Sequence, residues 1–253
     1  MVISFYNIKG GVGKTSTSIN IASIAKKRGK ILLFDLDIQG ASSYFFNKNP
    51  KKRDILSKPI EKIIKNTEFE NLDIIPADTN LEKYKNSISI LIEELKKIYD
   101  FIIIDAPATL NPLTKDILKH SSIILVPVLP NILSLRTYNQ IINTNLNNNI
   151  KLFVNQFENK PSHKKIIKHI LTLPTPQYLK TYIPKSELIE SMSFHKFLLL
   201  YFLDTFLLHL IYKKALIQLI HFLVYKYLNI VILAKLKYVE LFFCEMVCFR
   251  IDL

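Results

Sequence analysis

The sequence predicts an α/β fold in which a mostly parallel sheet is flanked by helices. Three apolar runs carry this prediction, because each has the length of a strand and little polar alternation, as expected for a parallel strand covered on both faces. The runs are Val2–Tyr6, Ile31–Phe34 and Phe101–Ile104. A glycine-rich turn follows the first run and an aspartate ends each of the other two. Polar groups are therefore expected at the edge where the carboxyl ends of parallel strands meet.

The glycine-rich turn lies between the first apolar run and a helical pattern over residues 17–27. Backbone N–H groups and a helix N-terminus form an anion site at such a turn. Lys14 supplies positive charge for the outer phosphates of a nucleotide, and the Thr15 hydroxyl is a suitable ligand for Mg²⁺. The residues expected to bind the nucleotide here are Gly10, Gly11, Val12, Gly13, Lys14, Thr15 and Ser16. The predicted ligand is ATP with Mg²⁺.

The turn departs from the strict phosphate-loop pattern at two positions. Ile8 stands where that pattern has glycine, and Lys9 stands directly before the glycines. This combination resembles the deviant Walker A sequence of the ParA/MinD family of ATPases, which have a P-loop NTPase fold of the SIMIBI-like class. The resemblance implies an ATP-dependent homodimer in which Lys9 reaches the phosphates held by the partner subunit. Lys9 and Lys14 are then expected to be catalytic.

A second motif of the same family follows the second apolar run. The residues Asp35-Leu36-Asp37-Ile38-Gln39-Gly40 resemble the family sequence Asp-Leu-Asp-Pro-Gln-Gly, with Ile38 in place of the proline. By this resemblance Asp37 is catalytic, since it positions or activates the attacking water, and Asp35 lies near the Mg²⁺ ion. The alternative is that both carboxylates merely cap the end of a strand.

The third apolar run ends at Asp105, as a Walker B strand does. A buried strand fixes this carboxylate where it can hold Mg²⁺ directly or through a water molecule. The continuation over residues 106–108 differs from the family's Thr-Pro-Pro at two of three positions, which leaves Asp105 itself in place. The expected metal ligands are therefore Thr15, Asp35 and Asp105.

Further strands are predicted over residues 72–77, 122–128 and 151–157, with helices over 81–97 and from Pro112. Asn155 lies near the end of the last of these strands. The family resemblance implies that Asn155 contacts the adenine base. The alternative is ordinary turn chemistry, because asparagine is common where a strand ends.

The chain is strongly basic, with a formal net charge of +13, which favours polyanionic partners such as nucleic acid or an anionic membrane surface. Charge alone does not choose between these partners. Family members bind DNA non-specifically through basic residues late in the domain. The DNA-binding candidates here are Lys160, Lys164, Lys165, Lys168 and Lys185. The alternative is a solvated helix face without a partner.

The resemblance covers residues 1–196, which form the expected ParA-like ATPase domain. Residues 197–253 contain neither glycine nor proline and are mostly apolar or aromatic. Three hypotheses apply to this segment: it associates with a membrane, it forms terminal helices that pack on the sheet, or it is out-of-frame translation. Its two cysteines, Cys244 and Cys248, indicate no disulfide framework, and no secretory signal is expected.

The function implied by the resemblance is that of a ParA/Soj-type ATPase for plasmid or chromosome partition. Such a protein dimerises on ATP binding, binds DNA non-specifically and hydrolyses ATP under stimulation by a ParB-like protein. The expected location is cytoplasmic and nucleoid-associated. Two alternatives stay open: a MinD-like, membrane-associated positioning ATPase that uses residues 197–253, and a non-hydrolysing relic with a damaged C-terminus.

Overall fold

The structure, a computed structural model, describes residues 1–81, 88–147, 149–173, 178–187, 189 and 192. All of them belong to the first of the two units into which the chain divides, Met1–Ala215. The hydrophobic segment 197–253 lies outside the described residues, so the hypotheses about it and the predicted boundary at residue 196 stay predictions. None of the helices that the structure describes is long and apolar enough to cross a membrane.

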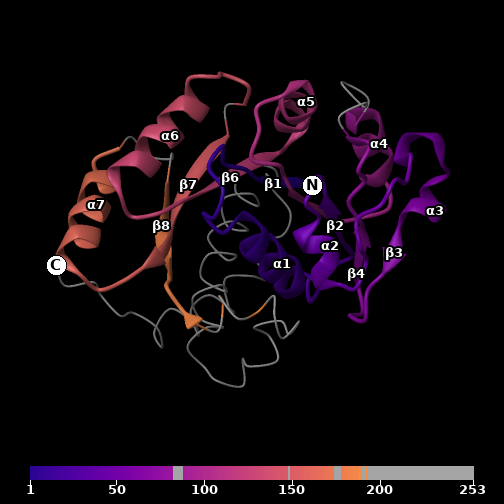
Figure 1. Cartoon of the computed structure of the whole chain (residues 1–253), viewed down its shortest axis with the longest axis horizontal. Helices are drawn as coiled ribbons and strands as arrows, with labels where there is room; N and C mark the ends of the chain where they lie inside the picture. The colour runs from indigo at the N-terminus through magenta and orange to yellow at the C-terminus, as the bar shows by residue number, and fades with distance from the viewer. Residues whose placement is uncertain (82–87, 148, 174–177, 188, 190–191, 193–253) are drawn as a thin grey trace, which may run out of the picture. The chain divides into compact units, whose positions relative to one another are not determined.

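One eight-stranded sheet runs through this unit in the order β3-β4-β2-β5-β1-β6-β7-β8 (Figure 1). The strands are β1 Val2–Phe5, β2 Ile31–Asp35, β3 Lys65–Asn66, β4 Leu72–Ile75, β5 Phe101–Asp105, β6 Ile123–Val128, β7 Ile150–Phe157 and β8 Tyr178–Pro184. Every pairing between described strands is parallel except that of β3 with β4. The predicted mostly parallel sheet is confirmed.

Helices connect the strands and lie on both faces of the sheet. They are α1 Lys14–Ala25, α2 Ala41–Phe45, α3 Ile60–Ile63, α4 Ile88–Leu95, α5 Pro112–His120, α6 Ile132–Ile142 and α7 Pro161–Leu171, with a 3₁₀ turn, η1, over Ile55–Ser57. Figure 1 shows α4, α5 and α6 along one side of the sheet and α1 on the other. Helix α1 begins three residues before the predicted start, because Gly13 already serves as its N-cap.

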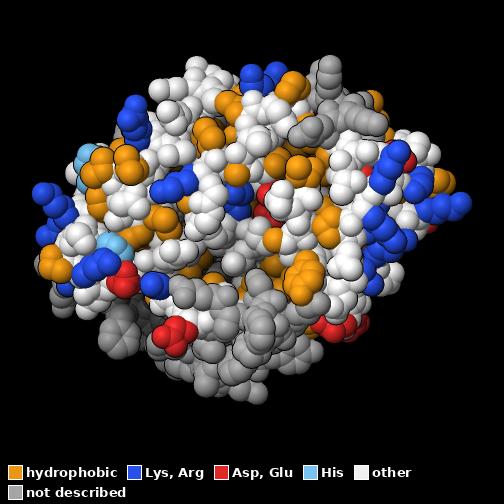
Figure 2. Space-filling view, viewed as in Figure 1, with side chains coloured by type: hydrophobic (Ala, Val, Ile, Leu, Met, Phe, Trp, Pro, Cys, Tyr) orange, Lys and Arg blue, Asp and Glu red, His pale blue; other side chains and the backbone are white. Residues whose placement is uncertain are grey.

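The basic character of the chain is visible on its surface. In Figure 2, Lys and Arg side chains gather at two places, over the part of the molecule where Figure 1 places α3 and β3 and over the part where it places α7. These elements lie near opposite edges of the sheet, since β3 is one edge strand and β8, next to β7, is the other. The net charge is therefore carried by separate surfaces.

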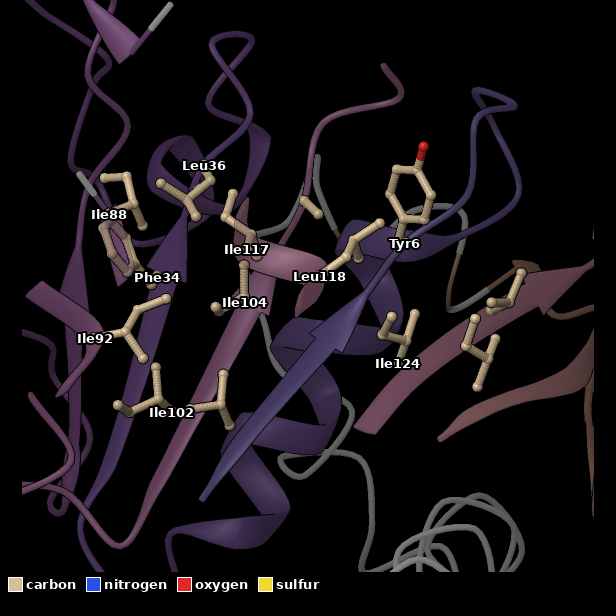
Figure 3. Packing of buried hydrophobic residues seen from close by; sticks show 14 of the residues in the cluster. Tyr6, Phe34, Leu36, Ile88, Ile92, Ile102, Ile104, Ile117, Leu118 and Ile124 are labelled. Atoms are coloured by element: carbon tan, nitrogen blue, oxygen red, sulfur yellow. The ribbon is translucent and has the colours of Figure 1, made fainter. Parts of the chain in front are cut away.

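The hydrophobic core joins one face of the sheet to helices α4 to α7. Figure 3 shows the part of this core that involves α4 and α5. On β5, Ile102 and Ile104 are fully buried on this face and cluster with Ile92 of α4 and Ile117 of α5. Burying each such side chain contributes roughly 1.5–3 kcal/mol. Because side chains alternate along a strand, Ile103 lies on the other face, where α1 packs against β2 and β5.

The strand register brings the two predicted aspartates together. Asp35 of β2 pairs with Asp105 of β5, and Asp105 also pairs with Phe5 of β1. All three strands are parallel, so their carboxyl ends meet at one edge. The loops that follow β1, β2 and β5 converge there, which is where a sheet of this kind binds its ligand.

Asp78 fixes the long connection between α2 and β4. Its carboxylate is fully buried and accepts hydrogen bonds from the backbone N–H groups of Arg53, Ile55 and Asn80 at 3.0, 3.1 and 2.9 Å.

Asp78→Ala removes the acceptor for these donors, so we expect the free energy of unfolding to fall by roughly 2–4 kcal/mol. Urea unfolding followed by circular dichroism measures this change. Glu68→Ala, at an exposed position, is the control. Equal urea midpoints for the two variants would show that Asp78 does not stabilise the connection between α2 and β4.

Candidate nucleotide-binding site

The backbone of the glycine-rich turn requires glycine at two positions. Gly11 and Gly13 have φ angles of 69° and 94°, in the left-handed region that glycine adopts without steric cost. A Cβ atom at Gly13 would lie 2.0 Å from Nδ2 of Asn155, so this position excludes any side chain. Gly10 has neither a positive φ nor a close neighbour. The turn therefore closes tightly against β7 at Gly13 and is open at Gly10.

Two buried asparagines hold the turn from two different strands. At β7, Nδ2 of Asn155 donates to the carbonyl of Val12 at 2.7 Å. After β1, Nδ2 of Asn7 donates to the carbonyl of Pro127 at 2.8 Å, and its Oδ1 accepts from the backbone N–H of Lys9 at 2.9 Å. The adenine contact of Asn155 stays a prediction, while its contact with the turn is observed. Asn7 was not selected from the sequence.

Lys14 is a buried cation at the start of α1. Its side chain is 7% exposed, and Nζ donates to the carbonyl of Lys9 at 3.4 Å. Burial lowers the pKa of Lys14, and the neighbouring carboxylates of Asp105 and Asp37 act in the opposite direction. The ammonium group thus lies among the backbone of the turn and both acidic motifs. Lys9 itself is half-buried, and its reach to a partner subunit stays a prediction.

Asp105 is fully buried, and one of its oxygens has no hydrogen-bond partner. Its Oδ2 accepts from the Ser42 hydroxyl at 2.7 Å, whereas Oδ1 is one of two buried side-chain oxygens without a donor in the described part of the chain. Burial raises the pKa of Asp105 to about 6, although hydrogen bonding from Ser42 and Thr15 opposes this. An unpaired buried oxygen is costly, which indicates that a ligand completes the site.

Asp35 is also fully buried, but the protein satisfies both of its oxygens. Oδ2 accepts from the backbone N–H and the hydroxyl of Ser43 at 2.8 and 2.6 Å, and Oδ1 accepts from the N–H of Asp37 at 3.2 Å. The Ser43 hydroxyl in turn accepts from the N–H of Ala77 at 2.7 Å. Burial, followed by the nearby Asp105 carboxylate, raises the pKa of Asp35 to about 8. Asp35 therefore holds α2 through Ser43, and Ser43 links α2 to the segment after β4. The role of Asp35 as a metal ligand stays a prediction.

The residues present fit a Mg²⁺ ion that is bound together with a nucleotide. Mg²⁺ prefers one or two carboxylate or hydroxyl oxygens of the protein, with phosphate and water oxygens completing its shell. The unpaired Oδ1 of Asp105 and the hydroxyl of Thr15 supply such oxygens at one place. Asp35 and Asp105 are buried side by side on adjacent strands, and the repulsion between two negative charges favours protonation of one of them. A bound cation would favour the charged forms of both. The unpaired oxygen is therefore available to a cation.

Asp37 lies in a tight turn directly after β2. Its Oδ1 accepts from the N–H of Gln39 at 3.0 Å, and its carbonyl accepts from the N–H of Gly40 at 2.8 Å. Gly40 has a φ of 62°, and a Cβ there would lie 2.0 Å from Pro50. The half-buried carboxylate is thus presented at the edge of the site beside Lys14. Its action on a water molecule stays a prediction.

The DNA-binding candidates gather near the edge of the sheet formed by β7 and β8. Lys164, Lys165 and Lys168 are exposed on α7, whereas Ile166 and Ile170 of the same helix are buried. Lys160 precedes α7 and forms an ion pair with Glu158 at 2.7 Å. Lys185 is exposed at the end of β8, and its N–H donates to the carbonyl of Phe157 at 2.9 Å. Their contact with DNA stays a prediction.

Asn7→Ala is expected to weaken ATP binding by about tenfold, an effect of roughly 1.4 kcal/mol. The variant removes the acceptor for the N–H of Lys9 and the donor for the carbonyl of Pro127, so the turn loses its link to β6. Titration with a fluorescent ATP analogue measures the affinity. Asn139→Ala, at an exposed position on α6, is the matched control. Equal affinities for the two variants would show that Asn7 does not support the turn.

Comparisons with known proteins agree with this geometry. The AAA_31 family model, described as an AAA domain, matches residues 1–160. The sporulation initiation inhibitor protein Soj of Bacillus subtilis is 35% identical over 161 residues, which cover 56% of this chain and 64% of Soj. A ParA family protein of Mycoplasma genitalium is 32% identical over 174 residues, with coverages of 57% and 64%. The chain thus spans less than two thirds of these curated relatives.

Solved structures share the fold. A plasmid partition protein from Borrelia burgdorferi bound to AMPPNP superposes with a TM-score of 0.64 at 24% identity, over 76% of this chain and 88% of that one. The septum site-determining protein MinD of Pyrococcus horikoshii, complexed with Mg-ADP, superposes with a TM-score of 0.72 at 21% identity, over 84% and 93% of the two chains. At these identities the likeness shows a common P-loop ATPase fold.

Proposed function

The chain belongs to the AAA_31 family of AAA domains, and we propose that it is a Mg²⁺-dependent ATPase of the ParA type that acts in plasmid or chromosome partition. The observation that carries the proposal is that three motifs lie together at the edge where the parallel strands have their carboxyl ends. The glycine-rich turn and Asp37 follow β1 and β2, and Asp105 ends β5, which lies between these two parallel strands in the sheet. The relatives named Soj and ParA support the assignment to partition.

In the proposed reaction the chain's residues position ATP and stabilise charge on the transferred phosphoryl group. When bound, Mg²⁺ neutralises charge on the phosphate oxygens, and Thr15 and Asp105 would hold it. Lys14 contacts the outer phosphates from a buried position, where the low dielectric strengthens its attraction. Lys9 of the partner subunit adds a second positive charge. Asp37 orients the attacking water from the turn after β2.

ATP binding brings two copies together across their nucleotides, and the dimer binds duplex DNA without reading its sequence. Lys160, Lys164, Lys165, Lys168 and Lys185 contact phosphates on this proposal, and a ParB-like protein stimulates hydrolysis and release. The protein would accordingly be found on the nucleoid in the cytoplasm. The exposed lysines of α7 support this step, since lysine binds phosphate as a point charge.

Co-sedimentation of the full chain with duplex DNA and, separately, with anionic liposomes tests the proposal. The expected result is DNA binding that requires ATP and Mg²⁺ and falls steeply as salt rises. Binding to liposomes alone would contradict the proposal in favour of the MinD-like alternative. ATP binding without any turnover would identify the relic instead.

A further inference from the structure

A second basic surface lies at the edge of the sheet opposite to α7. Residues 48–65 contain seven Lys or Arg and only two Asp or Glu. We call this region the α3 basic surface, and its basic residues are Lys48, Lys51, Lys52, Arg53, Lys58, Lys62 and Lys65. Figure 2 shows Lys and Arg side chains gathered there, over the place of α3 and β3 in Figure 1. The nucleotide site does not use any of them.

The charge of this surface faces solvent and is not neutralised by ion pairs within the described residues. Lys51, Lys52, Lys58 and Lys62 are exposed. The ion pairs that the structure describes lie elsewhere, on α4, on α5 and before α7. Lys65 donates to the carbonyl of Lys62 at 2.8 Å, a contact that leaves its positive charge unpaired with an acid. Positive potential therefore accumulates over this region.

The segment that carries these lysines is anchored to the body of the fold. Besides the backbone N–H groups that donate to Asp78, Nε of Arg53 donates to the carbonyl of Ala77 at 3.3 Å, and its Nη2 donates to the carbonyl of Asn49 at 3.0 Å. Lys51 also forms a backbone bridge with Asp78. Arg53 is therefore a structural residue, and the lysines stand on a pre-ordered segment. Binding through such a segment costs less ordering than binding through a free loop.

The chemistry of the surface favours nucleic-acid phosphates over a membrane. Stable interfacial membrane binding adds large apolar side chains that enter the lipid to the electrostatic attraction of basic residues. The exposed large hydrophobic residues that the structure describes all lie outside residues 48–65, and they are Ile38, Tyr44, Ile90, Ile98, Ile132, Leu133 and Leu171. The exposed basic residues here are lysines, which neutralise phosphates without reading bases. A duplex with regularly spaced phosphates matches a surface of several lysines.

We propose that the α3 basic surface is a second contact for the DNA phosphate backbone, separate from the candidates on and near α7. The inference rests on the proposed function, since it takes DNA as the partner. Adjacent strands are roughly 4.8 Å apart, so the two edges of the sheet are separated by about 30 Å. The two surfaces therefore bind different phosphates, and each releases its own counterions. Their contributions to the salt dependence add.

The test replaces four exposed lysines of the α3 basic surface in the full chain. The variant is Lys51→Gln, Lys52→Gln, Lys58→Gln and Lys62→Gln. Its matched control carries four glutamines at exposed lysines elsewhere, at positions Lys27, Lys97, Lys115 and Lys119. A third variant carries Lys164→Gln, Lys165→Gln and Lys168→Gln on α7. The control loses the same net charge as the α3 variant. A difference in DNA affinity between them therefore depends on the position of the lysines and not on total charge.

Binding to a fluorescent duplex of about three helical turns is measured by anisotropy across a KCl series, with ATP and Mg²⁺ present. We expect the α3 variant to bind at least about tenfold more weakly than the control. Its plot of log K against log [KCl] should be shallower by about 2 to 4, since each lost phosphate contact removes about 0.9 from the slope. Thermal unfolding of all variants, followed by circular dichroism, checks that the fold is retained.

An α3 variant that matches the control in both affinity and slope would overturn the inference, as long as the unaltered chain binds DNA. Loss of binding to phosphatidylglycerol vesicles with unchanged DNA binding would also overturn it, in favour of a lipid surface. A chain that does not bind DNA before any substitution would instead overturn the DNA step of the proposed function. The α7 variant shows whether the two surfaces act separately. It should lose DNA binding even though its α3 basic surface is intact.

Discussion

Lys14→Ala is expected to lower the rate of ATP hydrolysis by at least about 10²–10³-fold and to weaken ATP binding at least about a hundredfold. The ammonium group of Lys14 is buried at the start of α1, where it lies near both Asp105 and Asp37. Removing a preorganised charge of this kind from the transferred phosphoryl group costs about 10²–10³ in rate. Phosphate release measures turnover, and titration with a fluorescent ATP analogue measures binding.

The control for this prediction is Lys27→Ala. Lys27 is an exposed lysine just beyond the C-terminus of the same helix, so its loss removes equal charge outside the site. We expect its turnover and ATP affinity to stay within about twofold of the unaltered chain. A Lys14→Ala protein that binds ATP as well as the Lys27→Ala protein would show that the glycine-rich turn is not the phosphate site.

Asp37→Ala is expected to retain ATP binding and ATP-dependent dimers while hydrolysis falls by about 10²–10³-fold. The carboxylate lies at the open edge of the site and does not hold the turn of the glycine-rich loop, so its loss should affect the water rather than the nucleotide. Phosphate release and size-exclusion chromatography with light scattering separate these two effects.

Two further variants make the Asp37 prediction specific. Asp37→Asn preserves an oxygen that can accept from the N–H of Gln39, and it should be as inactive as Asp37→Ala if the charge of the carboxylate is what matters. Gln39→Ala alters the exposed neighbour in the same turn and should hydrolyse ATP normally. Asp37→Ala dimers that turn over ATP at the parent rate would refute the assignment of Asp37.

Much of the fold could be predicted because its signals are local. The buried strands β2 and β5 are uninterrupted apolar runs, and each ends at the aspartate that the sequence analysis singled out. The glycine-rich turn was equally clear, since Gly11 and Gly13 meet a backbone requirement that no other residue meets as easily. A local pattern therefore placed the phosphate site and both acidic motifs at one edge.

The supports of the site could not be predicted, because they depend on which strands are neighbours. Asn7 bonds to Pro127 only because β1 lies beside β6, and these residues are 120 positions apart in the chain. Ser42 and Ser43 reach Asp105 and Asp35 from α2, a five-residue helix without a periodic apolar pattern. The one signal available in the sequence is the pair of adjacent serines that follows the second acidic motif after a single alanine, Ala41.

Asn155 illustrates a different limit. The sequence places it near the end of a strand, and the family resemblance implies a contact with adenine, which stays a prediction. The structure shows its side chain donating to Val12 and lying against Gly13. The position of a residue in a strand does not by itself say whether its side chain contacts the glycine-rich turn or a bound base.

Single-turnover phosphate release from ATP by the full chain, with duplex DNA and with either Mg²⁺ or excess chelator, tests the central claim most directly. The account predicts slow phosphate release that requires Mg²⁺ and disappears in Lys14→Ala and Asp37→Ala. ATP that stays bound and intact on the unaltered chain in the presence of Mg²⁺ and DNA would contradict it, and would identify a nucleotide-binding protein that is not an ATPase.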